Sequence, residues 1–434
     1  MLIFVTASVT LIGSFVGTPL GGLHSDLWGR KNAMMATQIL TLLGLLCLRF
    51  AQSVPMFHIG NFLGGYSEGV YIPVSALYTA EINQPKLRNY TMSFNMLAYF
   101  LTYCVTYMIA SFVSWRQTIS ILIPLPCINF LTLLLCPESP TWYMLKGRTE
   151  DAFDTLMKLR GNSEAARLEM KKIQENLEEQ KVLQKQSSNQ SSYIKETISV
   201  LSKGTFIRPC SVLIFLYCIG WQWTGEASLT FYTVDIVQEF NIPISPYMIS
   251  AGLGLYQFLV ALISVFLSAV VPRRKYYIGS GILVMAGAGI LGSYCHLQHY
   301  TVFTETLKSY PILHGIPIFA LLLYFGGYTS GFVTVCHMLL GELLPSNARG
   351  IGSCIVVQCS NISFFLVTKF TPYCAKALGM DGFFWLFSII TLISILFFYF
   401  CVPETFGVSL EDIEQHYREI CYPKKFRKST EKWN

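Results

Sequence analysis

The sequence predicts an all-α membrane protein whose eleven transmembrane helices form two bundles. Three observations support this fold class: charged side chains are scarce over most of the 434 residues, apolar stretches of helix length recur along the chain, and two charged motifs occur twice in the same order. An α-helix needs about 20 apolar residues to cross the hydrocarbon core of a bilayer. The stretches lack the ten-residue alternation of a transmembrane β-barrel, so helices are predicted.

The distribution of charge excludes several other classes of protein. Hydrophobic residues make up 53% of the chain and charged residues 13%, whereas a soluble domain carries about 25% charge. Of the 56 charged residues, 22 lie between Pro137 and Arg208 and 12 follow Pro403, so the other 331 residues share 22. A single water-soluble core and a disordered chain are therefore excluded. The net charge of +6 forms no basic face outside the loop and tail, which argues against a nucleic-acid partner.

Five apolar ranges precede the charged central segment and six follow it. The first begins at Met1 with no basic segment before it and no clear cleavage site after it, so we expect a membrane helix rather than a signal peptide. The predicted organisation is a five-helix bundle in 1–136, a helical loop in 137–208, a six-helix bundle in 209–402 and a tail in 403–434. The predicted spans are 2–23, 32–51, 56–80, 92–113, 116–136, 209–230, 246–270, 276–295, 311–340, 351–371 and 381–402.

The basic residues set the expected orientation of the spans. With alternating loops, one side of the membrane carries eight Lys and Arg residues in short loops, and the opposite side carries five. The central loop and the tail fall on the side of the eight and add 18 more. Cytoplasmic loops are enriched in Lys and Arg. We therefore expect the central loop and the C-terminus in the cytoplasm and the N-terminus outside.

The central loop is the one predicted soluble element. Thr149–Arg160 has the pattern of an amphipathic helix, with Thr149 as a candidate cap and Gly161 as a stop. Glu164–Gln184 predicts a second, highly charged helix, and Ser187–Ser192 a linker. The thirteen cysteines are scattered and give neither a disulfide framework nor a zinc-ligand pattern, so no metal or cofactor is predicted.

Two charged motifs recur between the halves of the chain. The segment from Glu81 to Arg88 returns as Glu342 to Arg349 at an offset of 261, and Pro137-Glu138 returns as Pro403-Glu404 at an offset of 266. Parallel halves of this kind are typical of many secondary transporters. The second half has six predicted spans and the first has five, so we expect one helix to be missing at the front.

The repeated glutamates and arginines fall at the ends of predicted spans. Such charges can pair with each other, with neighbouring helices or with helix ends, and thereby hold one end of a bundle closed. The alternative is that rim charges only anchor the helices at the membrane surface. The presence of two copies in register favours a gating role for Glu81, Arg88, Glu342 and Arg349.

The motifs resemble those of a known family. Gly22-Leu-His-Ser-Asp26-Leu-Trp-Gly29-Arg30-Lys31 resembles a loop signature of the major facilitator superfamily, and Pro137-Glu-Ser-Pro140 with Pro403-Glu-Thr405 is similar to the sugar porter subfamily. The run from Pro137 to Gly161 is most similar to insect facilitated trehalose transporters. The resemblance implies a major-facilitator-type two-bundle fold of twelve helices, of which the first is missing here. It also implies gating roles for Asp26, Arg30, Glu138 and Glu404.

The resemblance further implies where a sugar would bind. The seventh family helix carries Gln-Gln-x-Ser-Gly-x-Asn, and the matching segment here runs from Trp221 to Ala227, with Gln222 in place of the second Gln. Trp221 and Ala227 replace two amides of this signature, and Glu226 is gained. Gln222 is a candidate sugar ligand because an amide both donates and accepts; its alternative role is an interhelical hydrogen bond. Tyr232 follows as an aromatic candidate.

Three further candidate ligands come from later helices. Gln257 falls near an Asn of the eighth family helix, and Asn361 lies where the eleventh carries Asn-Trp. His337 occupies the place of the Trp in a Gly-Pro-x-Pro-Trp motif whose prolines are absent; it is either a ligand or a hydrogen-bonded interior His. Glu68 lies mid-span, either facing a cavity or protonated against a neighbouring helix. Asn61 replaces an Arg that proton-coupled relatives use, which disfavours that coupling route.

The leading functional hypothesis is facilitative transport of a sugar, trehalose or a hexose, across the plasma membrane. The sequence shows no nucleotide-binding loop, no paired catalytic carboxylates in a soluble domain and no metal-ligand cluster, so we do not expect an enzyme. One alternative is a degenerate paralogue that acts as a sugar sensor or does not transport. Another is a carrier of a different small solute, such as a cation attracted by Glu68 and Glu226. The expected partners are a small-molecule sugar and the lipid bilayer.

Overall fold

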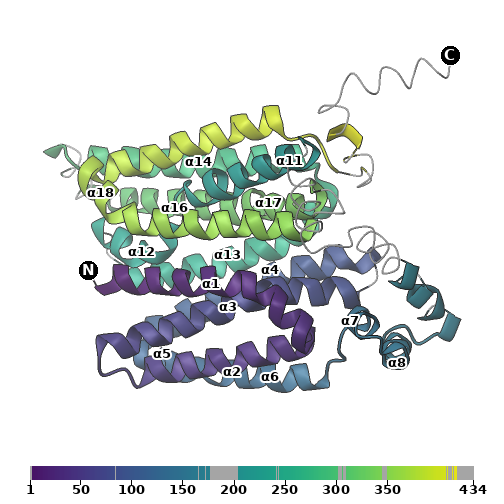
Figure 1. Ribbon diagram of the computed structural model, residues 1–434. Helices are drawn as coiled ribbons and strands as arrows, with labels where there is room; N and C mark the ends of the chain where they lie inside the picture. The colour runs from purple at the N-terminus through teal and green to yellow at the C-terminus, as the bar shows by residue number, and fades with distance from the viewer. Residues whose placement is uncertain are drawn as a thin grey trace, which may run out of the picture. The chain divides into compact units, whose positions relative to one another are not determined.

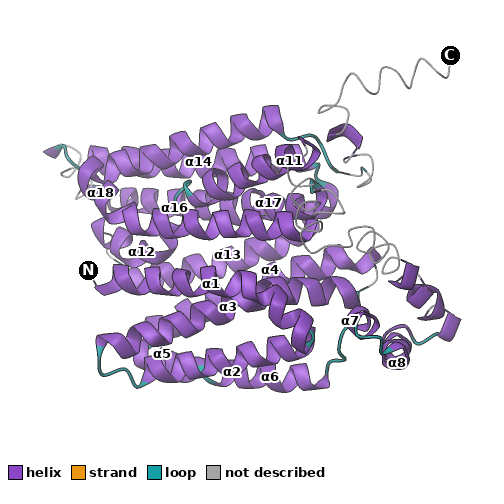
Figure 2. Cartoon of the chain, viewed as in Figure 1, coloured by secondary structure: helices purple, strands orange, loops and turns teal. Residues whose placement is uncertain are grey.

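The structure, a computed structural model, is helical wherever secondary structure is described, and the described residues include no strand (Figure 2). Contacts group 1–93 and 115–202 into a first unit, and 94–114 and 203–434 into a second. The predicted boundaries of bundles, loop and tail remain predictions. The structure describes residues 2–83, 85–164, 166–171, 173–175, 204–240, 242, 244–301, 305, 309–344, 349–406, 408, 413 and 415–417.

The first unit consists of the helices before the central loop and two short helices of the loop itself (Figure 1). Pro124 separates two of its helices, because proline is favoured in the first turn of a helix and disfavoured inside one. The helices are α1 (Leu2–Trp28), α2 (Arg30–Arg49), α3 (Val54–Ile82), the start of α4 (Pro85–Phe112), α5 (Trp115–Leu122), α6 (Pro124–Leu135), α7 (Pro140–Leu145) and α8 (Thr149–Arg160).

Helices α1 and α3 pack with their backbones in close approach. A Cβ atom built on Gly65 of α3 would lie 1.9 Å from the carbonyl oxygen of Thr10 in α1, and one on Gly69 would lie 2.4 Å from that of Ser14. Cβ atoms built on Gly13 and Gly17 of α1 would likewise lie too close to backbone atoms of α3. Small residues at intervals of four are typical of membrane helices that associate through van der Waals packing. Gly65 and Gly69 of the predicted 56–80 span therefore serve helix packing.

The second unit contains helices interrupted by π-helical turns. Two such segments, η1 (Leu216–Gln222) and η3 (Tyr328–Phe332), each continue an α-helix in mid-span. π-helical turns are rare and are frequently found at functional sites. The remaining elements are α11 (Gly204–Phe215), α12 (Glu226–Glu239), α13 (Pro246–Val270), α14 (Arg273–Leu297), η2 (Pro311–His314), α16 (Gly315–Gly327), α17 (Val333–Glu342) and α18 (Arg349–Cys401).

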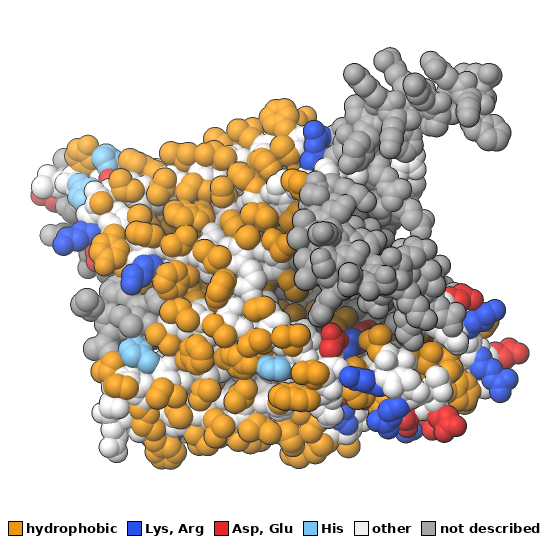
Figure 3. Space-filling view, viewed as in Figure 1, with side chains coloured by type: hydrophobic (Ala, Val, Ile, Leu, Met, Phe, Trp, Pro, Cys, Tyr) orange, Lys and Arg blue, Asp and Glu red, His pale blue; other side chains and the backbone are white. Residues whose placement is uncertain are grey.

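The helices of both units have the composition of membrane spans. Among the described residues, seven helices are long and apolar enough to cross a bilayer. The predicted spans 351–371 and 381–402 both fall on α18, which changes direction at Gly379 with φ of 73°, a left-handed conformation that favours glycine. The predicted count of eleven is not confirmed. Hydrophobic side chains cover the visible faces of the helices, and charged ones gather towards helix ends (Figure 3).

The central loop forms the predicted helix between Thr149 and Arg160. Gly161 ends α8 in the left-handed conformation, as expected, but Arg148 rather than Thr149 is the capping residue. Arg160 binds Glu169 through two contacts of 2.6 and 2.7 Å and donates to the carbonyl of Ile82 at the end of α3. The hydrogen bonds to Glu169 raise the pKa of Arg160. The predicted Glu164–Gln184 helix is described only in part, and Ser187–Ser192 and most of the tail lie outside the described residues.

Candidate functional site

A buried ion pair joins two helices at the loop-facing end of the first unit. Arg30 begins α2 and is 4% exposed. Its guanidinium contacts both carboxylate oxygens of Glu81, at 3.0 and 3.1 Å, and one oxygen of Asp26 at 3.1 Å. The hydroxyl of Ser139 also donates to Glu81. Bidentate pairing of this kind is strong and fixes the geometry of both partners.

Glu138 lies beside this pair and holds the first turn of α2. Its carboxylate accepts from the backbone N–H groups of Arg30 at 2.9 Å and Lys31 at 3.0 Å, which have no partner within the helix. The positive end of the helix dipole also favours a carboxylate here. Gly29 precedes α2 with φ of 99°, and a Cβ atom there would lie 2.3 Å from a Glu138 oxygen. Only glycine fits at this corner.

The second unit contains a matching cluster. Arg273 begins α14 and contacts Glu342 at 3.4 Å, and Thr405 donates to the same carboxylate at 2.6 Å. Glu404 accepts from the backbone N–H groups of Arg273 at 3.0 Å and Arg274 at 3.1 Å. Each member therefore has a counterpart in the first unit. The copies differ in strength, because Arg273 makes one long contact where Arg30 makes two short ones.

The two clusters bring together six of the eight predicted gating residues. Asp26, Arg30, Glu81 and Glu138 meet in the first unit, and Glu342 and Glu404 meet in the second. We name these groups the first and second rim clusters. The gating role of both clusters remains a prediction.

The described partners of the repeated glutamates differ from the expected ones. The sequence motifs suggested that Glu81 pairs with Arg88 and Glu342 with Arg349, but the described contacts join them to Arg30 and Arg273. The side chains of Arg88 and Arg349 lie outside the described residues. Arg273 was missed, although Arg30-Lys31 recurs as Arg273-Arg274 at an offset of 243. That offset differs from 261 because the two halves differ in spacing between motifs.

Gln222 ends the π-helical segment η1 and is 5% exposed. Its amide nitrogen donates to Ser360 of α18 at 3.0 Å, whereas its amide oxygen is buried without a hydrogen-bond partner among the described residues. The interhelical hydrogen bond that formed the alternative hypothesis is therefore present. It uses one end of the amide and leaves the acceptor end available.

Gln257 repeats this pattern on α13. The side chain is 4% exposed, and its amide nitrogen has no hydrogen-bond partner among the described residues. Asn361 follows Ser360 in α18 and is partly buried. Among the described hydrogen bonds, none joins Gln257, Asn361 and Gln222 directly. The structure thus places two amides with unused hydrogen-bonding capacity inside the second unit.

His337 and Tyr232 are more completely engaged within the protein. The His337 ring contacts the carbonyl of Val333 at 3.1 Å and meets the Trp221 ring edge to face, with centroids 4.7 Å apart. Tyr232 is buried in α12, and its hydroxyl donates to the carbonyl of Thr368 at 3.5 Å. These contacts fit the alternative of an interior histidine. Ligand roles for His337 and Tyr232 remain predictions.

The two carboxylates of the alternative hypotheses lie in different settings. Glu226 begins α12 and accepts a hydrogen bond from Thr230 at 3.0 Å. None of the ion pairs described for this chain includes Glu226. Glu68 is exposed on α3 although it lies in mid-span. Both settings of Glu68, facing a cavity or packed against a neighbouring helix, remain predictions.

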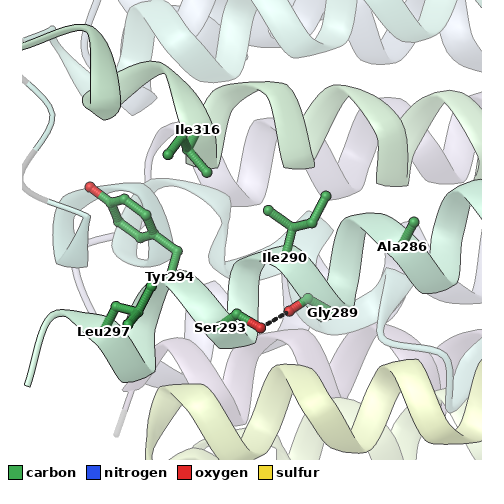
Figure 4. Close-up of a pocket in the computed structure, with 7 residues that line it drawn as sticks. All are labelled: Ala286, Gly289, Ile290, Ser293, Tyr294, Leu297 and Ile316. Carbon is green, nitrogen blue, oxygen red and sulfur yellow. Dashed lines mark hydrogen bonds between the residues drawn. The ribbon is translucent and has the colours of Figure 1, made fainter.

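A cavity of about 370 Å³ lies along α14 in the second unit (Figure 4). Its lining is mostly apolar, and the hydroxyl of Ser293 donates a hydrogen bond to the carbonyl of Gly289 at 2.9 Å. It contains none of the predicted sugar ligands. The lining residues are Ala286, Gly289, Ile290, Ser293, Tyr294, Leu297 and Ile316.

Comparisons with known proteins agree with the helical architecture. The family described as "Sugar (and other) transporter" matches residues 1–417. The facilitated trehalose transporter Tret1-2 homolog of Drosophila simulans is 26% identical over 405 residues, which are 93% of this chain and 79% of that protein. Facilitated trehalose transporter Tret1 of Apis mellifera ligustica is 25% identical over 416 residues, 94% of this chain and 78% of that protein.

Solved structures show the same fold. The major facilitator superfamily proton:xylose symporter XylE of E. coli, bound to 6-bromo-6-deoxy-D-glucose, matches with a TM-score of 0.74 at 20% identity. The match covers 96% of this chain and 89% of that one. The predicted major-facilitator fold class is therefore confirmed, apart from the number of helices.

Proposed function

Because this chain belongs to the sugar (and other) transporter family over residues 1–417, we propose that it carries a sugar, trehalose or a hexose, across the plasma membrane by alternating access. The family consists of transporters, so the prediction that the protein is not an enzyme is confirmed. The trehalose transporters among its relatives support a sugar substrate. The basic loops support a cytoplasmic central loop and C-terminus.

The observation that carries the proposal is the unused hydrogen-bonding capacity of Gln222 and Gln257. A buried polar atom without a partner costs about 1–3 kcal/mol, so native proteins rarely keep one without a reason. Here an acceptor on Gln222 and a donor on Gln257 are both buried in the same unit. Sugar hydroxyls donate and accept at once and would satisfy both. Ser360 would then hold Gln222 in the orientation that presents its oxygen.

We propose that the two rim clusters form the cytoplasmic gate of this transporter. Each ties a loop-facing helix end to the start of the neighbouring helix through one arginine, which is buried in the first cluster and partly buried in the second. Alternating access requires such ends to have two arrangements while the substrate site stays fixed. The matching arrangement of the two clusters supports a gating role for both.

Replacing Gln222 by alanine should weaken sugar affinity several-fold to about a hundredfold. The change removes the free amide oxygen, which can accept about two hydrogen bonds from sugar hydroxyls, worth roughly 0.5–1.5 kcal/mol each. Affinity is measured by competition for labelled trehalose and glucose uptake into proteoliposomes, alongside the folded yield. Ser360→Ala is the comparison variant, because it removes the helix contact that orients Gln222 but keeps the amide, so its loss of affinity should be smaller than that of Gln222→Ala. Equal stability losses in both variants, with unaltered affinity, would make Gln222 a packing residue.

A cationic solute is the second candidate substrate, favoured by the carboxylate of Glu226, which lies four residues after Gln222 and takes part in none of the described ion pairs. Uptake of labelled trehalose, glucose and an organic cation into the same proteoliposomes separates the candidates. Saturable sugar uptake supports the sugar carrier. Cation uptake that Glu226→Gln abolishes supports the second candidate. Binding of sugar without uptake of any of the three would indicate a sensor.

Glu342→Gln should slow transport while substrate affinity is largely kept. The change removes the charge that attracts Arg273 but preserves the shape of the side chain, so the second rim cluster loosens without altering Gln222. Net uptake, exchange at equilibrium and binding are compared for this variant and for Glu175→Gln, an exposed glutamate of the central loop. Loss of binding with unchanged exchange would contradict a gating role.

A further inference from the structure

A second cavity lies at the loop-facing end of the first unit, outside the proposed sugar site. It has a volume of about 630 Å³ and lies among the start of α2, the end of α6, α7 and α8. Ligand sites in proteins typically have about 300–1,000 Å³. Three basic side chains line it, Lys31, Arg148 and Lys158, together with the aromatic rings of Trp142 and Tyr143.

The cavity is cationic once its internal contacts are counted. Glu138 is the one carboxylate of its lining, and backbone N–H groups at the start of α2 and at Ser139 occupy that carboxylate. Arg148 lies over the Tyr143 ring at 4.9 Å and pairs with Asp151, but both partners stay about half exposed. Lys158 is exposed. The arrangement suits a ligand with negative charge, since phosphate is bound well by Arg and Lys together.

An apolar face of α6 leads directly into this cavity. Leu125, Ile128, Leu131 and Leu135 follow one another at intervals of three or four, so they share a face of the helix, and Leu135 is 88% exposed. Leu134 and Leu135 also line the cavity. The helix pair α5 and α6 is among the segments apolar enough to cross a membrane. The cationic cavity therefore opens where a lipid-facing helix surface ends.

We propose that this cavity binds the headgroup of an anionic phospholipid, with the acyl chains lying along the exposed face of α6. The site goes beyond the proposed sugar transport and takes its orientation from the proposed cytoplasmic loop, where anionic lipids are concentrated. The continuity of the basic lining with Leu134 and Leu135 favours a membrane lipid over a soluble phosphate compound. Trp142 and Tyr143 of its lining suit this location, because Trp and Tyr are enriched at membrane–water interfaces.

The site would also connect the loop to the first rim cluster. Lys31 lines the cavity, and its backbone N–H group binds Glu138, whose carboxylate also holds Arg30. Arg148 and Lys158 come from the loop side, at the two ends of α8. A bound lipid would therefore attach α8 to the start of α2.

Native mass spectrometry of the full chain from nanodiscs tests this proposal. Phosphatidylserine should be retained in preference to phosphatidylcholine with the same acyl chains. The Arg148→Gln/Lys158→Gln variant should lose roughly thirtyfold in phosphatidylserine affinity, because each basic side chain near an anionic surface contributes about fivefold. Lys171→Gln, an exposed charge of the same loop, is the matched control and should not change retention. Arg148→Lys/Lys158→Arg keeps the charges and should keep binding.

Two outcomes would overturn the lipid site. The first is equal retention of both phospholipids by the wild type, or unchanged phosphatidylserine affinity in the charge-removing variant. The second is displacement of phosphatidylserine by glycerophosphoserine at the same concentration, which would show that the chains contribute nothing and that a soluble phosphate compound is the ligand. Retention of phosphatidylserine against that competitor supports the lipid.

Discussion

Replacing Arg30 by alanine is expected to destabilise the first unit by about 3–5 kcal/mol, the usual loss when one partner of a buried ion pair is removed. Arg30 is 4% exposed, and its removal leaves Glu81, whose side chain is 11% exposed, without a cation among the described contacts. An unpaired carboxylate in that position is poorly solvated. Thermal unfolding of the purified protein in detergent should show a large drop in melting temperature.

The second rim cluster supplies the matched control for this change. Arg273→Ala removes one ion-pair contact of 3.4 Å, to a glutamate whose side chain is 23% exposed, together with a hydrogen bond to the Ser268 carbonyl, so the loss should be smaller. Adding Glu81→Ala to Arg30→Ala should recover part of the stability, because it removes the orphaned charge. Equal melting temperatures for Arg30→Ala and Arg273→Ala, with no recovery in the double variant, would contradict the strong pair at Arg30.

Replacing Gly65 by alanine is the second change with a large expected effect. The new Cβ atom would lie 1.9 Å from the Thr10 carbonyl oxygen, and a backbone atom cannot rotate away as a side chain can. Overpacking typically costs about 1–3 kcal/mol and occasionally more; here α1 and α3 must separate, so the upper end is expected. Folded yield after size-exclusion chromatography and the melting temperature should both fall.

The adjacent glycine provides the control for that prediction. A Cβ atom on Gly64 meets nothing within 4 Å, so Gly64→Ala adds a methyl group without a clash. It should be neutral or slightly stabilising, because alanine favours the helix by up to about 1 kcal/mol over glycine. If the two alanine variants have the same yield and melting temperature, the close approach of α1 and α3 is wrong.

The sequence predicted the features that depend on local pattern. Apolar length located helices throughout both units, and the α8 helix begins and ends at the expected residues, Thr149 and Arg160. The internal repeat pointed to glutamates that do form matching clusters. These features follow from composition and spacing alone, which the chain displays directly.

The sequence did not predict features that depend on packing between distant segments. The partners of Glu81 and Glu342 come from the starts of other helices, 51 and 69 residues away, and proximity within one motif suggested nearer arginines. Hydrophobic periodicity also gave no sign of the π-helical turns, because one added residue per turn barely alters an all-apolar pattern. The hydrogen bond from Gln222 to Ser360 likewise required the fold.

The π-helical segment η1 determines the direction in which the Gln222 side chain points around the helix axis. One residue advances an α-helix by about 100°, so a turn that contains one extra residue rotates everything beyond it by that angle relative to a regular helix. If η1 returned to α geometry, Gln222 would turn away from Ser360 while α11 and η1 stayed one helix. η3 occupies the corresponding place between α16 and α17. Each of the segments η1 and η3 can therefore present either of two faces, with no loss of length beyond a single residue's rise.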